Sequence, residues 1–384
     1  MKQYFYNARV VLPDQVLDRA AVLVEDGIIR AISPESGGDA QPVDLRGQWL
    51  LPGMVDLHCD AIEKEAEPRA KVMFPLDFAC LQVDRRNAAA GITTPYHALS
   101  FANTEWGVRN NDTAAELVRE VKRLQSQLLV DNRIHLRYEI TDATALPIIM
   151  ELLDEGSVDL LSIMDHTPGQ GQFKHLDAYV AYMMGNHGSS REEALQNAQD
   201  KMAARQDADD RVFAIMERAK SLGIPTASHD DDDPQRVATM KGLGASMSEF
   251  PINLETARAA HQQGLPTILG APNVMRGRSQ SGSMRAVDAI VAGVADCLCA
   301  DYAPATMLAA LFTLLKQEVL PMHEAMKLVA GNPARAAGLH DRGEIVVGKR
   351  ADLVAVTETG GLPMATGTWV AGRRAYAADY PQHG

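Results

Sequence analysis

Histidine and acidic residues follow several apolar segments of this sequence, and both are residue types that bind metal ions. The clearest case is LLPGMVDLHCD, residues 50–60, in which His58 and Asp60 end an apolar run. Side chains two residues apart on a strand point to the same face, so the two are expected to project together from its carboxyl end. Imidazole and carboxylate donors suit a divalent cation. A metal site needs further ligands, which the rest of the chain must supply.

Other apolar segments end in the same way. A single residue of this kind often caps a helix or hydrogen-bonds a loop, but repetition at several strand ends favours one shared site. Two divalent ions that share a carboxylate would generate a hydroxide nucleophile at neutral pH. Zinc is the expected metal, and the same donors accommodate manganese, iron or cobalt. The predicted ligands are His58, Asp60, Glu139, His166, His229 and Asp301. Asp301 is also the candidate catalytic residue, because it could accept the proton as the hydroxide attacks.

The segment APNVMRGRSQSGS, residues 271–283, offers a different chemistry. Its guanidinium and hydroxyl groups, on a glycine-bearing loop, are suited to phosphoryl oxygens. A solvated basic loop is the alternative interpretation. On a chain with a net charge of −13, a basic loop at the catalytic face is more informative than it would be elsewhere. The candidate substrate-binding residues here are Arg276, Arg278, Ser279 and Ser281.

Two further residues are candidates for substrate contact. Arg69, in the segment EPRAK, follows the first strand and could join the basic loop. His97 lies beside the end of the next predicted strand, where a structural hydrogen bond is an equal alternative to substrate contact.

The elements that position these residues alternate between strand and helix patterns. Short apolar segments are separated by helical periodicity, as in DTAAELVREVKRLQSQLL and MLAALFTLLKQEV. Such alternation predicts a parallel sheet, and eight strands predict an α/β fold closed as a TIM (β/α)8 barrel, with its chemistry at the carboxyl ends of the strands. The strand candidates are MVDLHC, GITTPYHAL, RIHLRYEI, VDLLSIMDH, GIPTASHD, MSEFP, PTILGAP and DCLCADY.

Both ends of the chain have a different texture, with short β-branched and apolar segments broken by Gly, Asp and Pro. Residues 1–51 and 342–384 are therefore predicted to form one small β-sandwich domain. Residues 52–341 are predicted to form the metal-dependent hydrolase barrel.

Composition restricts the partners. The net charge of −13 argues against a nucleic-acid surface or a polybasic membrane anchor. No segment has the length of a membrane span, and no signal peptide is evident. Four cysteines in 384 residues, none in a CxxC pair, do not indicate a disulfide framework. These observations predict a cytoplasmic protein. Association into a homo-oligomer is compatible with the sequence, which identifies no interface.

Several motifs resemble those of the amidohydrolase superfamily, namely LPGMVDLH, the late ADY and the closing GNPARAAGLHDRGEIVVGKRADLVAV. Members are metal-dependent TIM-barrel hydrolases with a small β-sandwich made from both chain ends. The motifs HCDAIEKEAEPR, HLRYEI, MDHTPGQGQF, SHDDDD and APNVMRGRSQSG resemble, in the same order, the diphosphatases of the carbon–phosphorus lyase pathway of phosphonate catabolism. This resemblance implies cleavage of alpha-D-ribose 1-methylphosphonate 5-triphosphate to the 5-phosphate and pyrophosphate, by metal-hydroxide attack at the α-phosphorus. The family's ligand positions fall on the six residues predicted above.

Three alternatives remain open. The same phosphoanhydride chemistry could act on a nucleotide. A carbon–nitrogen hydrolase, such as a cyclic amidase or a deaminase, would use the same barrel, although the Arg- and Ser-bearing loop argues against a small neutral substrate. A scaffold without catalysis would have no need for six polar groups at the strand ends.

Overall fold

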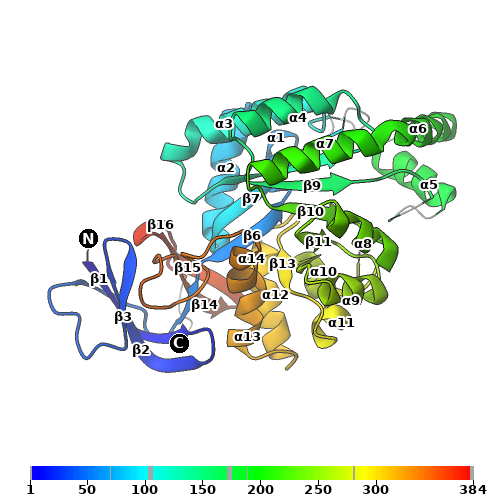
Figure 1. Ribbon diagram of the computed structural model, residues 1–384. Coiled ribbons are helices and arrows are strands. Elements are labelled where there is room, and N and C mark those ends of the chain that lie inside the picture. The colour runs from blue at the N-terminus through cyan, green and yellow to red at the C-terminus, as the bar shows by residue number, and fades with distance from the viewer. Residues whose placement is uncertain are drawn as a thin grey trace.

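The computed structural model describes residues 2–69, 71–102, 107–169, 171, 175–187, 189–279 and 282–380. Its main strands form two separate sheets of eight strands each. Figure 1 shows the first and last strands of the chain together at one side of the molecule, with the helix-covered barrel beside them. The predicted fold class, a TIM barrel with a separate β unit built from both chain ends, is confirmed.

The barrel contains all eight strands that the sequence predicts for it. Neighbouring strands are parallel and follow the chain order from β6 to β13. Their residues are buried, apart from the half-buried Arg133 at the start of β8, because helices cover the outer face and side chains fill the interior. The bounds are β6 (Met54–Cys59), β7 (Ile92–Phe101), β8 (Arg133–Glu139), β9 (Leu160–Met164), β10 (Thr226–His229), β11 (Met247–Glu249), β12 (Thr267–Gly270) and β13 (Cys297–Cys299).

The barrel closes between its first and last strands at the predicted site. The Asp60 amide donates to the Asp301 carbonyl at 2.8 Å, and the Asp301 amide donates to the His58 carbonyl at 2.9 Å. Because these backbone bonds join the two ends of the sheet, they fix the relative positions of three of the predicted ligands.

The outer helices bury apolar faces against the strands. In α3, for example, Asn110 caps the first turn by accepting a hydrogen bond from the Thr113 amide, and Leu117, Val118 and Val121 are buried. The helices of the barrel are α1 (Ala61–Ala66), α2 (Leu76–Ala90), α3 (Asn111–Leu124), α4 (Ala145–Asp154), α7 (Ala208–Ser221), α8 (Pro234–Gly242), α9 (Leu254–Gln262), α10 (Ala271–Arg276), α11 (Ala286–Val291), α12 (Ala305–Lys316), α13 (Met322–Met326) and α14 (Asn332–Ala336).

Two additional helices interrupt the alternation between β9 and α7. They are α5 (Leu176–His187) and α6 (Arg191–Ala204), and they extend beyond the barrel in Figure 1. A capping box between Ser190 and Glu193 begins α6. The pair has an apolar cluster of its own, made of Tyr179, Val180, Met183, Ala194 and Ala198. We call α5 and α6 the helical insertion.

The second sheet joins the chain ends. Its order is β16-β15-β14-β5-β1-β2-β3, and β4 pairs with β1. The link between the ends is the antiparallel pairing of β5 with β14. The bounds are β1 (Lys2–Val11), β2 (Val16–Glu25), β3 (Ile28–Ile32), β4 (Gln41–Asp44), β5 (Trp49–Pro52), β14 (Leu353–Thr359), β15 (Leu362–Val370) and β16 (Arg373–Ala377).

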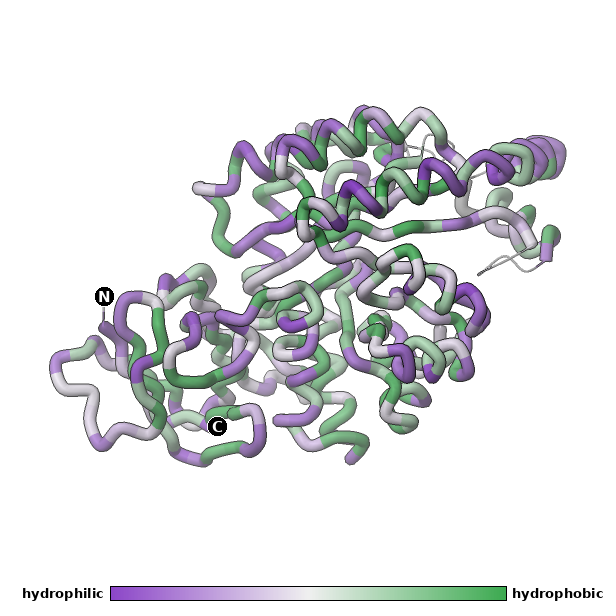
Figure 2. Tube along the Cα trace, in the orientation of Figure 1, coloured by the Kyte–Doolittle hydropathy of each residue, from purple (hydrophilic) through white to green (hydrophobic). Residues whose placement is uncertain are grey.

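Figure 2 shows the distribution of hydropathy along the chain. Hydrophobic residues follow the barrel strands, whereas α6, with the sequence REEALQNAQDKMAA, is largely hydrophilic. None of the helices in the described parts of the chain combines the length and apolarity needed to cross a membrane.

Candidate active site

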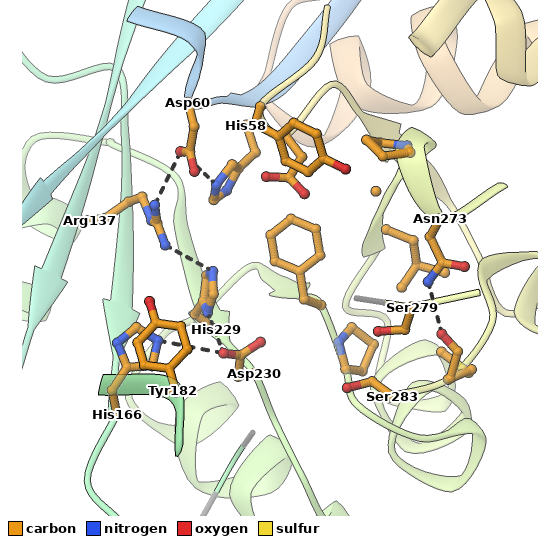
Figure 3. A pocket seen from close by; sticks show the side chains of 18 of the residues that line it. His58, Asp60, Arg137, His166, Tyr182, His229, Asp230, Asn273, Ser279 and Ser283 are labelled. Carbon is orange, nitrogen blue, oxygen red and sulfur yellow. Dashed lines mark hydrogen bonds and ion pairs between the residues drawn. The ribbon is translucent and has the colours of Figure 1, made fainter. Parts of the chain in front are cut away.

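A cavity of about 470 Å³ opens at the carboxyl ends of the barrel strands. Its size is in the range of small-molecule sites. Figure 3 shows His58, Asp60, Arg137, His166, His229 and Asp230 gathered on one side, with Asn273, Ser279 and Ser283 across from them. The charged and imidazole side chains that line it are His58, Asp60, Arg109, Arg137, His166, Lys201, His229, Asp230, Arg276, Arg278 and Asp301.

Five of the six predicted ligands line this cavity, and the sixth, Glu139, is buried beside it. Potential donor atoms form three groups within which they lie no more than 4.8 Å apart. The groups share His58 and His229, so together they make one continuous donor cluster. They are His58, Asp60 and Asp301; His58, His229 and Glu249; and His166, His229 and Asp230.

Glu249 orients His58 from behind. The carboxylate Oε1 lies 2.7 Å from His58 Nδ1, and its Oε2 accepts a hydrogen bond from the Ser162 hydroxyl at 2.6 Å. With Nδ1 held in this way, the ring turns Nε2 toward Asp60, at 3.2 Å. Burial lowers the pKa of His58, but Glu249 and Asp60 outweigh it and raise the pKa to about 10.

Glu139, which we predicted as a metal ligand, lies outside these three donor groups and contacts His166 as Glu249 contacts His58. Its Oε2 lies 2.9 Å from His166 Nδ1, and its Oε1 accepts from the Thr141 hydroxyl at 2.9 Å. The ammonium of Lys201 lies 3.8 Å from the same carboxylate. Burial raises the pKa of Glu139, but Lys201 and His166 lower it to about 2. A carboxylate that holds the far nitrogen of a ligating imidazole fixes its tautomer and orientation.

Three residues at this edge of the barrel have strained backbone conformations. Asp230, Phe250 and Asp301 each directly follow a strand, and their φ angles are 56°, 53° and 54°. Non-glycine residues in the left-handed region cost on the order of 1 kcal/mol each and persist only where the surroundings impose them. Three such residues around one cavity indicate that the surrounding structure holds their side chains in place although the backbone conformation is locally unfavourable.

Asp60 is held by two arginines. Its Oδ1 lies 3.2 Å from Arg137 Nη1, and its Oδ2 lies 3.3 Å from Arg109 Nη2. Arg109 also donates to Glu63 at 2.8 Å, and Arg137 Nη2 lies 3.5 Å from His229 Nε2. Burial opposes ionisation of Asp60, but Arg137 and His58 hold its pKa well below the ordinary value.

These donors fit a divalent cation. The Nδ1 atom of His229 is buried without a hydrogen-bond partner in the described chain, 3.3 Å from the Asp230 carboxylate. Burial lowers the pKa of His166, but Asp230 and Glu139 raise it to about 9. His58 and His166 are therefore protonated, and their positive charges balance the negative charges of the surrounding carboxylates. A bound cation would displace such protons.

Asp301 is the exception among the carboxylates that line the cavity, because the pKa values of Asp60 and Asp230 are lowered. Burial and the neighbouring charge of Asp60 raise its pKa to about 6. A carboxyl group with a pKa near neutrality suits proton transfer.

The described part of the basic loop lines the cavity. Arg276 ends α10, directly after β12, and Arg278, Ser279 and Ser283 also line the cavity. Arg276 and Arg278 are exposed, and neither has an ion pair among the described residues. Ser281 lies outside the described residues.

Arg69 and His97 are not brought to the cavity lining. Arg69 is exposed, in a short bridge with Val72. His97 lies inside β7, four residues before its end at Phe101, because the strand continues further than the sequence indicated. Its Nε2 lies 2.7 Å from Asn132 Oδ1, and burial lowers its pKa to about 4. This is the structural alternative considered for His97.

Several residues at the site were absent from the predicted set, among them Arg109, which holds Asp60. Asp230 and Glu249 do stand at predicted strand ends, and their position was the signal available. Arg137 lies two residues before Glu139 on β8 and therefore faces the same way. Lys201 comes from the helical insertion, and its helical context gave no sign of a role in the site.

Comparison with known proteins gives a consistent result. The amidohydrolase family matches residues 138–376. The alpha-D-ribose 1-methylphosphonate 5-triphosphate diphosphatase of Escherichia coli is 34% identical over 355 residues, which cover 91% of this chain and 93% of that protein. An imidazolonepropionase of Pseudomonas paraeruginosa is 26% identical over 373 residues, 87% of each chain.

A solved structure shares the fold. The 5-methylcytosine deaminase from Klebsiella pneumoniae, liganded with 5-fluorocytosine, superposes with a TM-score of 0.65 and 16% identity. The match covers 100% of this chain and 99% of that one.

Proposed function

The chain belongs to the amidohydrolase family, and from that premise we propose that it hydrolyses alpha-D-ribose 1-methylphosphonate 5-triphosphate to the 5-phosphate and pyrophosphate, with a divalent metal centre. The observation that carries the proposal is that the donor cluster and the Arg276–Arg278 loop line a single cavity. The 34% identity to the Escherichia coli diphosphatase over most of both chains supports the substrate.

The donor cluster would hold the metal, in our proposal two ions, with zinc the first candidate and manganese, iron and cobalt compatible with the same ligands. A divalent ion supplies Lewis acidity and an activated water near neutral pH. His58, His166 and His229, with Asp60, Asp230 and Asp301, are the residues that would bind it. Glu249 and Glu139 hold the first two imidazoles in orientation.

Asp301 has the position and the acidity of a general base. It lies in one donor group with His58 and Asp60, on the surface of the cavity. With a pKa raised to about 6, it is ionised at neutral pH and can accept a proton as water attacks phosphorus.

The arginines of the loop match the leaving group. Cleavage at the α-phosphorus releases pyrophosphate, on which negative charge develops in the transition state. Arg276 and Arg278 face this cavity and are not neutralised by a carboxylate in the described chain. Guanidinium groups bind phosphoryl oxygens with charge-assisted hydrogen bonds, which contribute about 1.5–3 kcal/mol each.

Product analysis by phosphorus NMR tests the proposal. Metal-loaded protein is incubated in parallel with ribose 1-methylphosphonate 5-triphosphate and with ATP. We expect pyrophosphate from the ribosyl compound. Pyrophosphate from ATP alone would retain the chemistry and move the substrate to nucleotides. No product from either, with metal bound, would favour a carbon–nitrogen hydrolase of the kind represented by the imidazolonepropionase relative.

A further inference from the structure

Lys201 reaches the catalytic cavity from outside the barrel. It lies on α6 of the helical insertion, its residue is only 5% exposed, and its side chain is among those that line the cavity. Lysine is rarely so buried unless its charge is matched. Here the Glu139 carboxylate lies 3.8 Å from the Lys201 ammonium, and the same carboxylate contacts the His166 ring at 2.9 Å. Lys201 and the His166 ring therefore share one buried carboxylate.

The barrel topology places Lys201 and the basic loop on opposite sides of the cavity. Glu139, beside Lys201, ends β8, and Arg276 follows β12. These strands are four apart in a closed barrel of eight, which makes them diametrically opposed. The strands that carry most of the donor cluster, β9 to β11, lie between them. In Figure 3, accordingly, His166 and Tyr182 are on one side and Ser279 and Ser283 on the other.

The helical insertion contributes a partly aromatic wall to the cavity. Tyr179, Tyr182 and Met183 of α5, the other helix of the insertion, line the same cavity as Lys201. Tyr179 is fixed by a hydrogen bond from its hydroxyl to Asn197 on α6, so the insertion presents Lys201 from a supported surface. An insertion that contributes both an ammonium group and aromatic side chains to one cavity suits a ligand with a compact anionic head on a less polar body.

We propose that Lys201 and this wall form a second anion-binding subsite, which takes a phosphonate or phosphate monoester at the opposite end of a sugar whose other end lies on the Arg276–Arg278 loop. The inference rests on the proposed function, because it assumes that the bond cleaved lies at the donor cluster between the two anchors. It explains how one cavity would distinguish a pentose with anionic groups at both ends from a nucleotide, whose second end is a neutral base.

Binding measurements on metal-loaded protein test this subsite without turnover. The probes are ribose 1,5-bisphosphate, with two anionic ends, and ribose 5-phosphate, with one, titrated calorimetrically. We expect the wild-type protein to bind the bisphosphate at least tenfold more tightly, since a charged hydrogen bond contributes that much or more. Lys201→Met should bring this ratio close to one, and Lys201→Arg should preserve most of it. Arg191→Met is the matched control, because Arg191 is an exposed cation of the same helix and should leave the ratio unchanged.

Three results would overturn the subsite: similar wild-type affinities for the two probes, a Lys201→Met ratio equal to the wild-type ratio, or no binding of the bisphosphate. Lys201→Gln serves as a second uncharged variant if Lys201→Met does not fold. Hydrolysis of the ribosyl triphosphate is measured separately. If the affinity ratio of the two probes depends on Lys201 but the triphosphate is not hydrolysed, the proposed reaction is refuted and the subsite stands. If the triphosphate is hydrolysed but the affinity ratio does not depend on Lys201, the subsite is refuted and the proposed reaction stands.

Discussion

The bond between Glu249 and His58 gives the sharpest prediction about the metal centre. Glu249→Gln keeps the size of the side chain and one carbonyl oxygen that can still accept from His58 Nδ1. It removes the negative charge, which is fully buried and 2.7 Å from the imidazole. In the wild-type protein the Ser162 hydroxyl donates to the Glu249 carboxylate at 2.6 Å. The amide of the variant presents N–H donors to this hydroxyl instead.

The expected loss is a ten- to hundredfold decrease in metal affinity. Carboxylates that hold a ligating imidazole contribute on this scale, which corresponds to about 1.4–2.7 kcal/mol. Two consequences of the substitution act in the same direction. The imidazole becomes a weaker base, because Glu249 is the largest of the influences that raise the pKa of His58. Its orientation also becomes less strictly fixed.

Zinc affinity is measured by competition with a chromophoric chelator, and the pKa of His58 in metal-free protein by NMR titration. Both should decrease in Glu249→Gln. The matched control is Glu255→Gln, because Glu255 lies in the exposed first turn of α9, directly after the same barrel strand, and should leave both unchanged. Zinc affinity within twofold of wild type in Glu249→Gln would refute the role assigned to this carboxylate.

Three further predictions concern catalysis, substrate and stability. Asp301→Asn should abolish turnover while the midpoint of thermal unfolding stays near the wild-type value, and a wild-type rate would contradict its role as base. Arg276→Ala should raise KM for triphosphates more than for monophosphates, whereas equal effects would remove it from the β- and γ-phosphate contacts. Arg342→Met should lower the free energy of unfolding by about 2 kcal/mol at pH 7, because the half-buried Asp131 carboxylate loses its charged hydrogen bond from Arg342 and keeps only Arg133 and Arg350 nearby. Burial raises the pKa of Asp131, but Arg133 and Arg342 outweigh it and lower the pKa below the ordinary value of 3.8. The stabilisation by the ionised carboxylate is therefore fully present above pH 3.8 and is lost as the pH falls through the folded-state pKa. Chemical unfolding at pH 7 and pH 3 should therefore show a smaller difference from wild type at pH 3, and an equal difference would contradict the assignment.

The barrel could be predicted from the sequence because its strands are short, apolar and bounded by turn residues. Each of the eight carries its own local signal, and a parallel sheet with helical connections is the fold that buries them all. The helical insertion gave a weaker signal. Its pattern is visible in REEALQNAQDKMAARQ, but nothing local indicates that α6 returns over the cavity and delivers Lys201 to it.

The roles of individual donors were harder to predict than their positions. Strand ends identify which side chains meet at one edge, and five of the six predicted ligands do line the cavity. Whether a carboxylate faces the cavity or stands behind an imidazole depends on tertiary geometry that no spacing reveals. Glu139 and Glu249 show this, because each is fully buried and contacts the Nδ1 atom of a histidine from another strand.

The arrangement of charge in the cavity also explains why an acidic protein can bind a highly anionic substrate. The carboxylates of the site are matched locally: Asp60 by Arg137 and Arg109, Glu139 by Lys201 and His166, and Glu249 by His58. The exposed Arg276 and Arg278 then act on an incoming ligand without opposition from a paired carboxylate in the described chain. Beyond about 10 Å the net charge of −13 is largely screened at physiological ionic strength. Affinity for a triphosphate is therefore governed by the cavity rather than by the surface as a whole, and we expect it to depend more strongly on Arg276 and Arg278 than on any exposed cation elsewhere.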